Sequence, residues 1–341
     1  MVAAVRAFVL TGPREYAVHD VPPPVAQPGE VVVDVERAGV CGTDVEFFTG
    51  QMQYLHDGFA HYPLRIGHEW CGVVASIGDG VDPKWLGKRV TGDTMLGCGT
   101  CHRCTTGFQH VCETRFEIGI RGGFAGALAE QLAVPARALH SLPDQVDPEL
   151  GALVEPGGNA LRSVLATGLE PGSSLLIIGP GTIGLIAAQI ARAHGLEVHL
   201  LGRSARSLDY ARRLGFESVH TATSLPNLRF DGAIDASDDP ASTGLAIELV
   251  EPGRRISLIG IAGSPSMVDA RLLVLKDVTA VGILSASPGL AGTIDLYASG
   301  TVDPRPLIAA TVGLDEVGSV LSSVRPDGAG AGPKILVDPR A

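Results

Sequence analysis

The chain has 341 residues, of which 45% are hydrophobic and 18% are charged. This composition suits one large or two medium globular domains and excludes general disorder. The 26 lysines and arginines are outnumbered by 37 acidic residues, and the formal net charge of -11 argues against duplex nucleic acid or an anionic membrane surface as a partner. Aromatic residues make up only 5%, which also disfavours stacking on single-stranded bases. A small molecule is therefore the partner to expect.

The N-terminal segment favours a strand over an export signal. Residues 1–10 are apolar, but they contain Arg6 and run directly into Thr11-Gly12-Pro13. The longest apolar stretch, residues 175–191, is interrupted by glycine and proline, so it predicts a strand, a turn and a helix rather than a membrane span. We therefore predict a cytoplasmic protein that does not bind a membrane.

Two kinds of domain are expected from the order of the predicted elements. Short alternating runs such as 30–35 and 71–75 indicate a β-rich domain over residues 1–156, which residues 293–341 complete at the other end of the chain. Between them, over residues 157–292, predicted strands and helices alternate at 175–178, 182–194, 197–201, 204–214, 232–236, 240–250 and 255–259. This alternation predicts a doubly wound parallel sheet, so the fold class is α/β plus all-β.

Four of the six cysteines follow the spacing C-x2-C-x2-C-x7-C, at Cys98, Cys101, Cys104 and Cys112. Four thiolates in one compact lobe can close a tetrahedron around Zn²⁺ and leave no position for substrate, so such a site would be structural. An iron–sulfur cluster also accepts four thiolates and is the alternative. Because no export signal precedes the cluster, a metal is favoured over disulfides.

A second set of metal-ligating side chains is spread over two segments. Cys41 stands in one, and His68 and Glu69 stand together in the other. A thiolate, an imidazole and a carboxylate are all zinc ligands, and three protein ligands plus a water describe a catalytic zinc. Taken singly, a histidine or a cysteine at these positions would equally suit a packed core.

A phosphate-binding motif follows the strand predicted at 175–178. The segment Gly179-Pro180-Gly181-Thr182-Ile183-Gly184 matches G-x-G-x-x-G between a strand and a helix, which is typical of dinucleotide binding. The next predicted strand lacks the terminal acidic residue that binds the ribose of NAD and ends instead in Gly202-Arg203-Ser204. A guanidinium and a hydroxyl suit the 2'-phosphate of NADP, so we predict NADP, with NAD as the alternative and Arg206 as a second candidate for the contact.

In combination, these motifs resemble the medium-chain, zinc-dependent alcohol and polyol dehydrogenases over nearly the whole chain. The resemblance implies a GroES-like catalytic domain (1–156 and 293–341) and a Rossmann cofactor domain (157–292). It implies one catalytic zinc per chain on Cys41, His68 and, as in the polyol branch, Glu69, and one structural zinc on the four-cysteine lobe. Glu155 stands where a Cys2His site has its second cysteine, which is similar to sorbitol, threonine and glucose dehydrogenases, and would bind the metal directly or through its water.

The resemblance also assigns residues to the substrate. Thr43 matches a hydroxyl that touches the substrate alcohol and starts a proton relay, and Glu46 stands where many relatives continue that relay with histidine. The stretch from Cys41 to Gly50 resembles NADP-using glucose dehydrogenases, in which a sugar-binding carboxylate stands at the position of Glu117. Asp44 either orients a metal ligand or caps a helix.

The substrate class stays open, because the segment 157–160, Gly-Gly-Asn-Ala, is similar to threonine dehydrogenase instead. The implied activity is hydride transfer between NADP(H) and a primary or secondary alcohol, polyol or sugar and its carbonyl. An NAD-dependent threonine-type dehydrogenase is the alternative enzyme, and an inactive nucleotide-sensing scaffold is the alternative outside enzymology. The predicted strand at 278–284 suits a sheet edge at which family members pair, so a homodimer or homotetramer is expected.

Overall fold

The computed structural model describes residues 4–341 and divides into two compact units. The first unit comprises Met1–Glu155, described from residue 4 onward, with Ile308–Gly330 and Lys334–Ala341. The second comprises Pro156–Leu307 and Ala331–Pro333. It therefore extends beyond residue 292, where the sequence analysis ended it. The reason is α10 (Leu290–Ala298), whose Thr293 and Tyr297 pack so closely on Gly157 that a Cβ added there would lie 2.5 and 2.2 Å from them.

The first unit is built around a mixed sheet of seven strands. Its order is β16-β17-β3-β4-β5-β9, with β8 also paired to β3. A hairpin of β1 and β2 and a short pair of β6 and β7 accompany it. The bounds are β1 (Val5–Gly12), β2 (Glu15–Val21), β3 (Glu30–Gly39), β4 (Glu69–Ile77), β5 (Arg89–Gly92), β6 (Met95–Leu96), β7 (Phe116–Glu117), β8 (Gln131–Pro135), β9 (Leu139–Ser141), β16 (Ile308–Val312) and β17 (Lys334–Val337).

Buried β-branched and aromatic side chains hold this sheet together. The valine-rich run of β3 is almost entirely buried, as expected for a central strand with neighbours on both sides. Phe8, Phe47 and Trp70 are among the largest side chains of the core. The helices of this unit are short: α1 (Gly42–Thr49), α2 (Gln53–His56), α3 (His102–Thr105), α4 (Pro148–Ala152) and α11 (Val317–Leu321).

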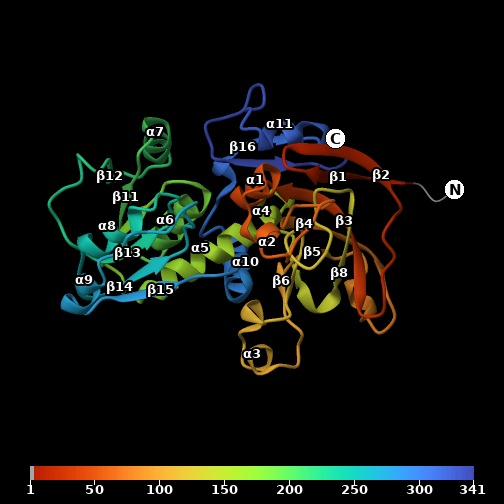
Figure 1. Cartoon of the computed structure of the whole chain (residues 1–341), viewed down its shortest axis with the longest axis horizontal. Helices are drawn as coiled ribbons and strands as arrows, with labels where there is room; N and C mark the ends of the chain where they lie inside the picture. Colours follow the sequence, from red (N-terminus) through yellow and green to blue (C-terminus); the bar gives the residue numbers. More distant parts are fainter. Residues whose placement is uncertain (1–3) are drawn as a thin grey trace. The chain divides into compact units, whose positions relative to one another are not determined.

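The second unit contains a six-stranded sheet in which every pair is parallel. Its order is β12-β11-β10-β13-β14-β15, and in Figure 1 α7 lies on the β11–β12 side of the sheet and α9 on the β14–β15 side. The strands are β10 (Ser174–Ile178), β11 (Glu197–Leu201), β12 (Val219–His220), β13 (Phe230–Asp235), β14 (Val250–Leu258) and β15 (Thr279–Gly282). The helices are α5 (Val154–Thr167), which starts at the unit boundary, α6 (Thr182–Ala193), α7 (Ala205–Arg213), α8 (Ser242–Leu249), α9 (Ala270–Leu275) and α10.

The strand order of this sheet positions the ligand. From β10 the chain adds β11 and β12 on one side of the sheet, and it then crosses to add β13, β14 and β15 on the other side, so the direction in which strands are added reverses between β10 and β13. In open α/β sheets, ligands bind at such a switch point, outside the carboxyl ends of the strands. The predicted fold class, α/β plus all-β, is confirmed by a first unit built on a mixed β-sheet and a second unit in which a parallel sheet alternates with helices. The apolar stretch 175–191 divides into β10 and α6, and within residues 4–341 no helix has the length and apolar character needed to cross a membrane.

Candidate active site and metal centres

Three predicted zinc ligands meet in the first unit. Gly39, at the end of β3, pairs with Glu69, at the start of β4, so the chain leaving β3 through Cys41 passes beside the chain entering β4 through His68. The ligand atoms of Cys41, His68 and Glu69 all lie within 4.8 Å of one another. His68 and Glu69 are buried, and Cys41 is half-buried.

Asp44 holds the two segments of this site in place. Its Oδ2 accepts the backbone N–H of Cys41 (2.9 Å), and its Oδ1 accepts the backbone N–H of Gly67 (3.2 Å). The same Oδ1 lies 3.8 Å from Nδ1 of His68. Cys41 is the N-cap of α1, and the Asp44 carboxylate completes a capping box by accepting the backbone N–H of Cys41. Asp44 therefore both caps the helix and orients the segments that carry the candidate ligands.

Burial and neighbouring charges shift the protonation of this site. Burial raises the pKa of the Asp44 carboxyl above its usual value. For His68, burial disfavours the charged form, but the hydrogen bond to Cys41 and the charges of Cys41, Asp44 and Glu155 outweigh it and raise the pKa well above the ordinary value. The charges of Cys41, Asp44 and Glu155 thus favour a positive charge at His68.

Lys334 is a member of this site that the sequence analysis missed. Its Nζ donates to Oε2 of Glu69 (2.5 Å) and to the carbonyl of Val40 (2.9 Å). Burial opposes the ammonium form, but Glu69 and Cys41 outweigh that effect and raise the pKa of Lys334. The sequence feature that could have indicated Lys334 is its position as the first residue of the otherwise apolar strand β17. One oxygen of Glu69 is therefore held by a cation of the protein itself.

Of the other predicted catalytic residues, Glu155, Thr43 and Glu46 lie on helices. Glu155 stands in the first turn of α5, is buried, and acts electrostatically on His68. Thr43 and Glu46 are both half-buried and stand three residues apart on α1, a spacing that puts them on one face of the helix. Burial raises the pKa of Glu46.

Glu117 belongs to a different network from the candidate ligands. Its Oε1 accepts hydrogen bonds from Nε of Arg115 (2.7 Å) and from the hydroxyl of Tyr54 (3.2 Å). The guanidinium of Arg121 lies 3.8 Å from the ring centroid of Phe59 in the same region. The carboxylate of Glu117 is thus buried and already satisfied by protein groups.

The donor set of the first site fits a zinc ion. It combines sulfur, nitrogen and oxygen atoms in one buried cluster, which is the chemistry of a zinc site that keeps a position for substrate. Among the described residues, Nδ1 of His68 is a buried nitrogen without a hydrogen-bond partner. Its neighbour at 3.8 Å is a carboxylate, the group that usually orients a metal-bound histidine.

The four-cysteine lobe forms a second candidate metal centre. The ligand atoms of Cys98, Cys101, Cys104 and Cys112 all lie within 4.8 Å of one another, and all four thiols are free of disulfides. Two pairs of sulfurs, Cys98 with Cys104 and Cys101 with Cys112, are each separated by 3.8 Å. For a tetrahedral ion with Zn–S bonds of about 2.3 Å, the sulfurs stand about 3.8 Å apart. The lobe is preformed for one such ion.

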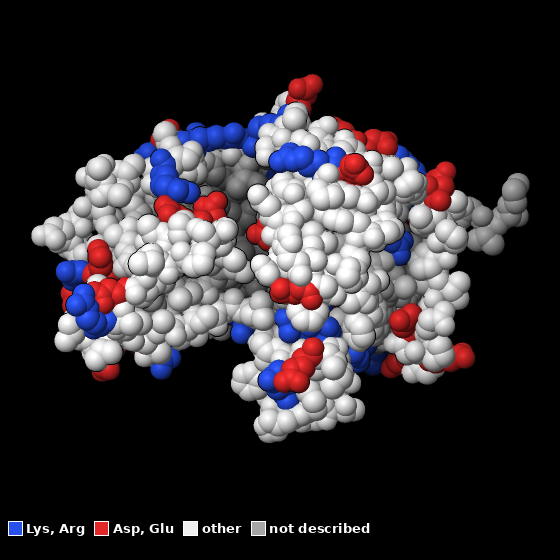
Figure 2. Space-filling view, in the orientation of Figure 1, with Lys and Arg blue, Asp and Glu red and all other residues white. Residues whose placement is uncertain are grey.

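The surroundings of the lobe support this arrangement. Hydrogen bonds from Thr100 and from the backbone of Cys101 lower the pKa of Cys98 to about 5, whereas burial raises the pKa of Cys104 to about 11, so the thiolate that a metal requires is favoured at Cys98. Gly97 is confined by the lobe, because a Cβ there would lie 2.5 Å from Sγ of Cys104. Figure 2 shows both acidic and basic side chains on the lobe that carries α3. Arg103 and Glu113 form an ion pair of 3.0 Å in this lobe.

The glycine-rich turn between β10 and α6 has the geometry of a phosphate cradle. Gly179 has φ of 98°, and a Cβ there would lie 2.6 Å from the carbonyl oxygen of Ala236. A Cβ on Gly184 would lie 2.0 Å from the carbonyl oxygen of Gly179, so this glycine allows the helix to pack against the turn. Gly181 caps α6 and has open space where its Cβ would be. Thr182 and Ile183 form the first turn of the helix, whose N-terminus favours an anion.

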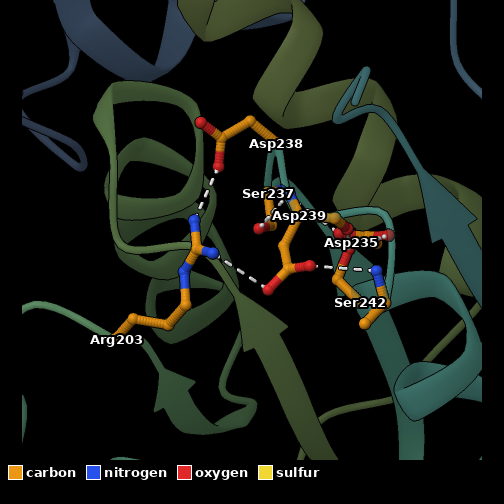
Figure 3. A network of polar contacts seen from close by, with 7 residues as sticks. Arg203, Asp235, Ser237, Asp238, Asp239 and Ser242 are labelled. Atoms are coloured by element: carbon orange, nitrogen blue, oxygen red, sulfur yellow. Dashed lines mark hydrogen bonds and ion pairs between the residues drawn. The ribbon is translucent and has the colours of Figure 1, made fainter. Parts of the chain in front are cut away.

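A cavity of about 740 Å³ lies at this turn within the second unit. Its wall includes Pro180 and Gly181 from the turn, Gly202 to Ser204 after β11, and Asp238 and Asp239 after β13. Ser204 is the N-cap of α7. Of the two arginines considered for the contact with the 2'-phosphate, Arg203 lines the cavity and Arg206 does not. The carboxylates of Asp238 and Asp239 beside Arg203 were not foreseen (Figure 3).

Comparison with known proteins identifies both units. Residues 27–144 match the family model of the alcohol dehydrogenase GroES-like domain, and residues 182–299 match that of the zinc-binding dehydrogenases. A 2-dehydro-3-deoxy-L-galactonate 5-dehydrogenase of Pseudoalteromonas atlantica is 32% identical over 92% of each chain. An L-threonine 3-dehydrogenase of Idiomarina loihiensis is 31% identical over 77% of this chain and 79% of its own.

Solved structures agree with these relationships. A zinc-binding dehydrogenase of Sinorhizobium meliloti 1021, bound to NADP, is 26% identical and superposes with a TM-score of 0.88 over 99% of this chain and 100% of its own. A dehydrogenase of Escherichia coli CFT073, complexed with NADH, is 25% identical with a TM-score of 0.89 over 98% and 99% of the two chains. The chain therefore belongs to the family of zinc-binding, medium-chain alcohol and polyol dehydrogenases, which are NAD(P)-dependent oxidoreductases.

Proposed function

We propose that the protein transfers a hydride between NADP(H) and a polyol, a sugar or a related primary or secondary alcohol and its carbonyl. The observation that carries the proposal is the convergence of the ligand atoms of Cys41, His68 and Glu69 within 4.8 Å of one another in the catalytic unit, with His68 and Glu69 buried. The choice of NADP is supported by Arg203, which lines the cofactor cavity where an NAD enzyme has a carboxylate. One catalytic and one structural zinc per chain are proposed, the latter on the four-cysteine lobe.

The groups that would hold the metal and the cofactor are distinct. Cys41, His68 and Glu69 would hold the catalytic zinc, with Glu155 as a direct or water-mediated fourth partner. The turn from Gly179 to Gly184 would bind the pyrophosphate. When bound, zinc supplies a Lewis acid that lowers the pKa of the substrate hydroxyl, and NADP supplies the hydride acceptor.

The protein's own contribution is to position groups and to move a proton. Asp44 fixes the backbone at Cys41 and Gly67 and thereby the direction of the ligands. The hydroxyl of Thr43 accepts the proton of the substrate alcohol and passes its own towards Glu46, one turn further along α1. Because burial raises the pKa of Glu46, this carboxylate is a stronger base than an exposed glutamate.

A second candidate is an NAD-dependent enzyme acting on a 3-hydroxy amino acid such as threonine. It is favoured by the L-threonine 3-dehydrogenase relatives. Gly158 is tightly packed, since a Cβ there would lie 2.9 Å from Ala286. Gly157 is likewise required by the packing of Thr293 and Tyr297, so the fold alone explains both glycines and they give the threonine assignment no support of their own. The NADP-dependent polyol or sugar dehydrogenase therefore stays the first candidate function.

The proposal includes assembly into a homodimer or homotetramer. Strand β15 is at the end of the six-stranded sheet and pairs with β14 on one side only among the described strands. Large apolar side chains are exposed in the same unit, most of all Met267, Val274 and Leu275, which are 91%, 80% and 80% exposed. An open strand edge with exposed apolar groups is the kind of surface that a second copy covers.

The experiment that tests the function is an initial-rate panel. Polyols, sugars, 3-hydroxy amino acids and simple alcohols are each tested with NADP and with NAD, and zinc is measured per chain. Turnover of a polyol or sugar with preference for NADP is expected. Turnover of threonine with NAD would establish the second candidate, and absence of turnover in a protein that carries both zinc ions would reject both.

A further inference from the structure

Arg203, the residue proposed to meet the 2'-phosphate of NADP, is already paired with two carboxylates. Its Nη1 lies 3.0 Å from Oδ2 of Asp239 and its Nη2 lies 3.1 Å from Oδ1 of Asp238. Figure 3 shows the two carboxylates turned towards the guanidinium from the loop that follows β13. The two aspartates are 35 and 36 residues further along the chain, so the pairing is a product of the fold.

The loop holds Asp239 in this position independently of Arg203. The backbone N–H of Asp239 donates to Oγ of Ser237 (3.1 Å), and its Oδ1 accepts the backbone N–H of Ala241 (3.0 Å). Ser242 closes the turn by donating to the carbonyl of Asp239 and to Oδ2 of the buried Asp235. The carboxylate of Asp239 is 29% exposed, against 83% for Asp238. Asp239 therefore forms a fixed part of the cavity wall, and Asp238 lies at its exposed rim.

The cavity wall carries more negative than positive charge, which disfavours the binding of a phosphate. Among the residues that line the cavity, Arg203 is the only basic one, and Asp238 and Asp239 are the acidic ones. A 2'-phosphate arriving at this wall must displace two carboxylates from the guanidinium and then remain close to them. A ribose 2'-hydroxyl has no such conflict, because it can donate a hydrogen bond to a carboxylate.

We propose that Asp238 and Asp239 are specificity-determining residues, which compete with the 2'-phosphate for Arg203 and so limit the preference of the enzyme for NADP over NAD. The inference rests on the proposed NADP function and deepens it. Arg203 supplies the attraction for the phosphate, and the aspartates supply the opposing charge and the acceptors for a free ribose hydroxyl. The wild-type protein accordingly accepts both cofactors, with a modest advantage for NADP.

The test compares two ligands that differ only in the 2'-phosphate, adenosine 2',5'-bisphosphate and adenosine 5'-monophosphate. Their binding to the zinc-loaded, full-length protein is measured by calorimetry at two salt concentrations. In the variant D238N/D239N we expect about tenfold tighter binding of the bisphosphate and a change below about twofold for the monophosphate. Asparagine keeps the Oδ1 acceptor for Ala241, and the melting temperature checks that the fold is retained.

A matched control and a second variant make the test decisive. Asp209→Asn removes another exposed carboxylate of the same unit, paired with Arg212 rather than with Arg203, and should leave both ligands unaffected. In R203A/D238N/D239N the gain relative to R203A should be much smaller, because the competition for the guanidinium is gone and only the direct repulsion between the carboxylates and the phosphate is relieved. An unchanged ratio of the two affinities in D238N/D239N, or an equal gain for both ligands, would overturn the inference.

The same experiment separates this inference from the proposed function. If R203A binds the bisphosphate as tightly as the wild type, Arg203 does not recognise the 2'-phosphate, and the NADP assignment fails together with the inference. If R203A weakens binding of the bisphosphate but D238N/D239N changes nothing, the NADP assignment stands and the role of the two aspartates is rejected.

Discussion

The ammonium group of Lys334 lies 2.5 Å from Oε2 of Glu69, and the two side chains are 3% and 2% exposed. Glu69 is a candidate ligand of the catalytic metal, and Lys334 comes from the strand β17 near the other end of the described chain. The ion pair thus connects the metal site to β17, which lies between β16 and β3 in the mixed sheet. A buried pair of this kind depends on both partners, since each neutralises a charge that would otherwise be left in the interior.

Replacing Lys334 by methionine should destabilise the first unit strongly. It removes the cation and leaves the carboxylate of Glu69 buried without its partner, which costs about 3–5 kcal/mol in comparable pairs. Urea unfolding of the protein, followed by circular dichroism, measures the change. The double variant K334M/E69Q serves as the control, because it removes both charges and should recover a large part of the loss. Equal instability of the single and double variants would show that packing, not charge, is responsible.

Adding a methyl group at Gly181 should weaken cofactor binding without disturbing the fold. A Cβ at this position meets no protein atom within 4 Å, and φ is -89°, so alanine is accommodated. The methyl group would occupy the space through which the pyrophosphate approaches the backbone, and we expect about a tenfold or greater rise in the Kd of NADP(H), measured by fluorescence.

Gly184 provides the contrast for that variant. Here a Cβ would lie 2.0 Å from the carbonyl oxygen of Gly179, so Gly184→Ala should lower the melting temperature as well as cofactor binding. Unchanged cofactor affinity in Gly181→Ala at full stability would show that the pyrophosphate does not pass over this turn.

The four-cysteine lobe should lose its metal when Gly97 is replaced by alanine. The new Cβ would stand 2.5 Å from Sγ of Cys104, a separation that forces the sulfur out of the tetrahedron. We expect the zinc content to fall by one ion per chain, as measured by mass spectrometry of the metal. Gly263→Ala is the matched control, because its Cβ meets nothing within 4 Å and the zinc content should stay at the wild-type level.

The pKa of Glu46 predicts a characteristic dependence on pH. Burial raises the pKa of this carboxyl, so the folded state holds a proton at pH values where the unfolded chain has released it. Below the ordinary pKa of glutamate, Glu46 is protonated in both states and does not lower the free energy of unfolding. As the pH rises through the raised pKa of the folded state, Glu46 becomes charged in its partly buried site and the free energy of unfolding falls. Glu46→Gln should therefore stabilise the protein near neutral pH and have no effect on stability in acid.

The same variant should impair turnover if Glu46 receives the proton relayed by Thr43. A fall in kcat together with loss of the acidic limb of the pH–rate profile is expected, whereas KM for the cofactor should stay unchanged. Retention of the acidic limb in Glu46→Gln would assign the base to another group and reject the proposed relay.

The parts of the molecule that could be predicted from the sequence are those whose residues lie close together along the chain. The turn from Gly179 to Gly184 and the four-cysteine lobe each lie within one local segment, so residue type and spacing specify them. The alternation of strands and helices likewise predicted the parallel sheet. The meeting of Cys41 with His68 was inferred through the family resemblance, because nothing in the 26 residues between them fixes the distance.

The features that were missed depend on contacts between distant segments. Lys334 and Glu69 are 265 residues apart, and the aspartates that face Arg203 follow a different strand of the sheet. The residues around each member of these ion pairs do not indicate its partner, because a charged residue is usually solvated unless the fold buries it. The position of α10 in the second unit was missed for the same reason. Its packing on Gly157 is decided by side chains that lie far apart in sequence.

The division of the first unit between two stretches of chain has a consequence for biosynthesis. Strand β17 pairs with β3 and with β16, and it supplies the ammonium that faces Glu69. During translation, the second unit, Pro156–Leu307 with Ala331–Pro333, is synthesised before β17. The cofactor unit can therefore fold while the catalytic unit still lacks one strand and its buried cation. A nascent chain halted before residue 334 should present an open sheet edge, which makes this interval the one in which the protein most needs a chaperone.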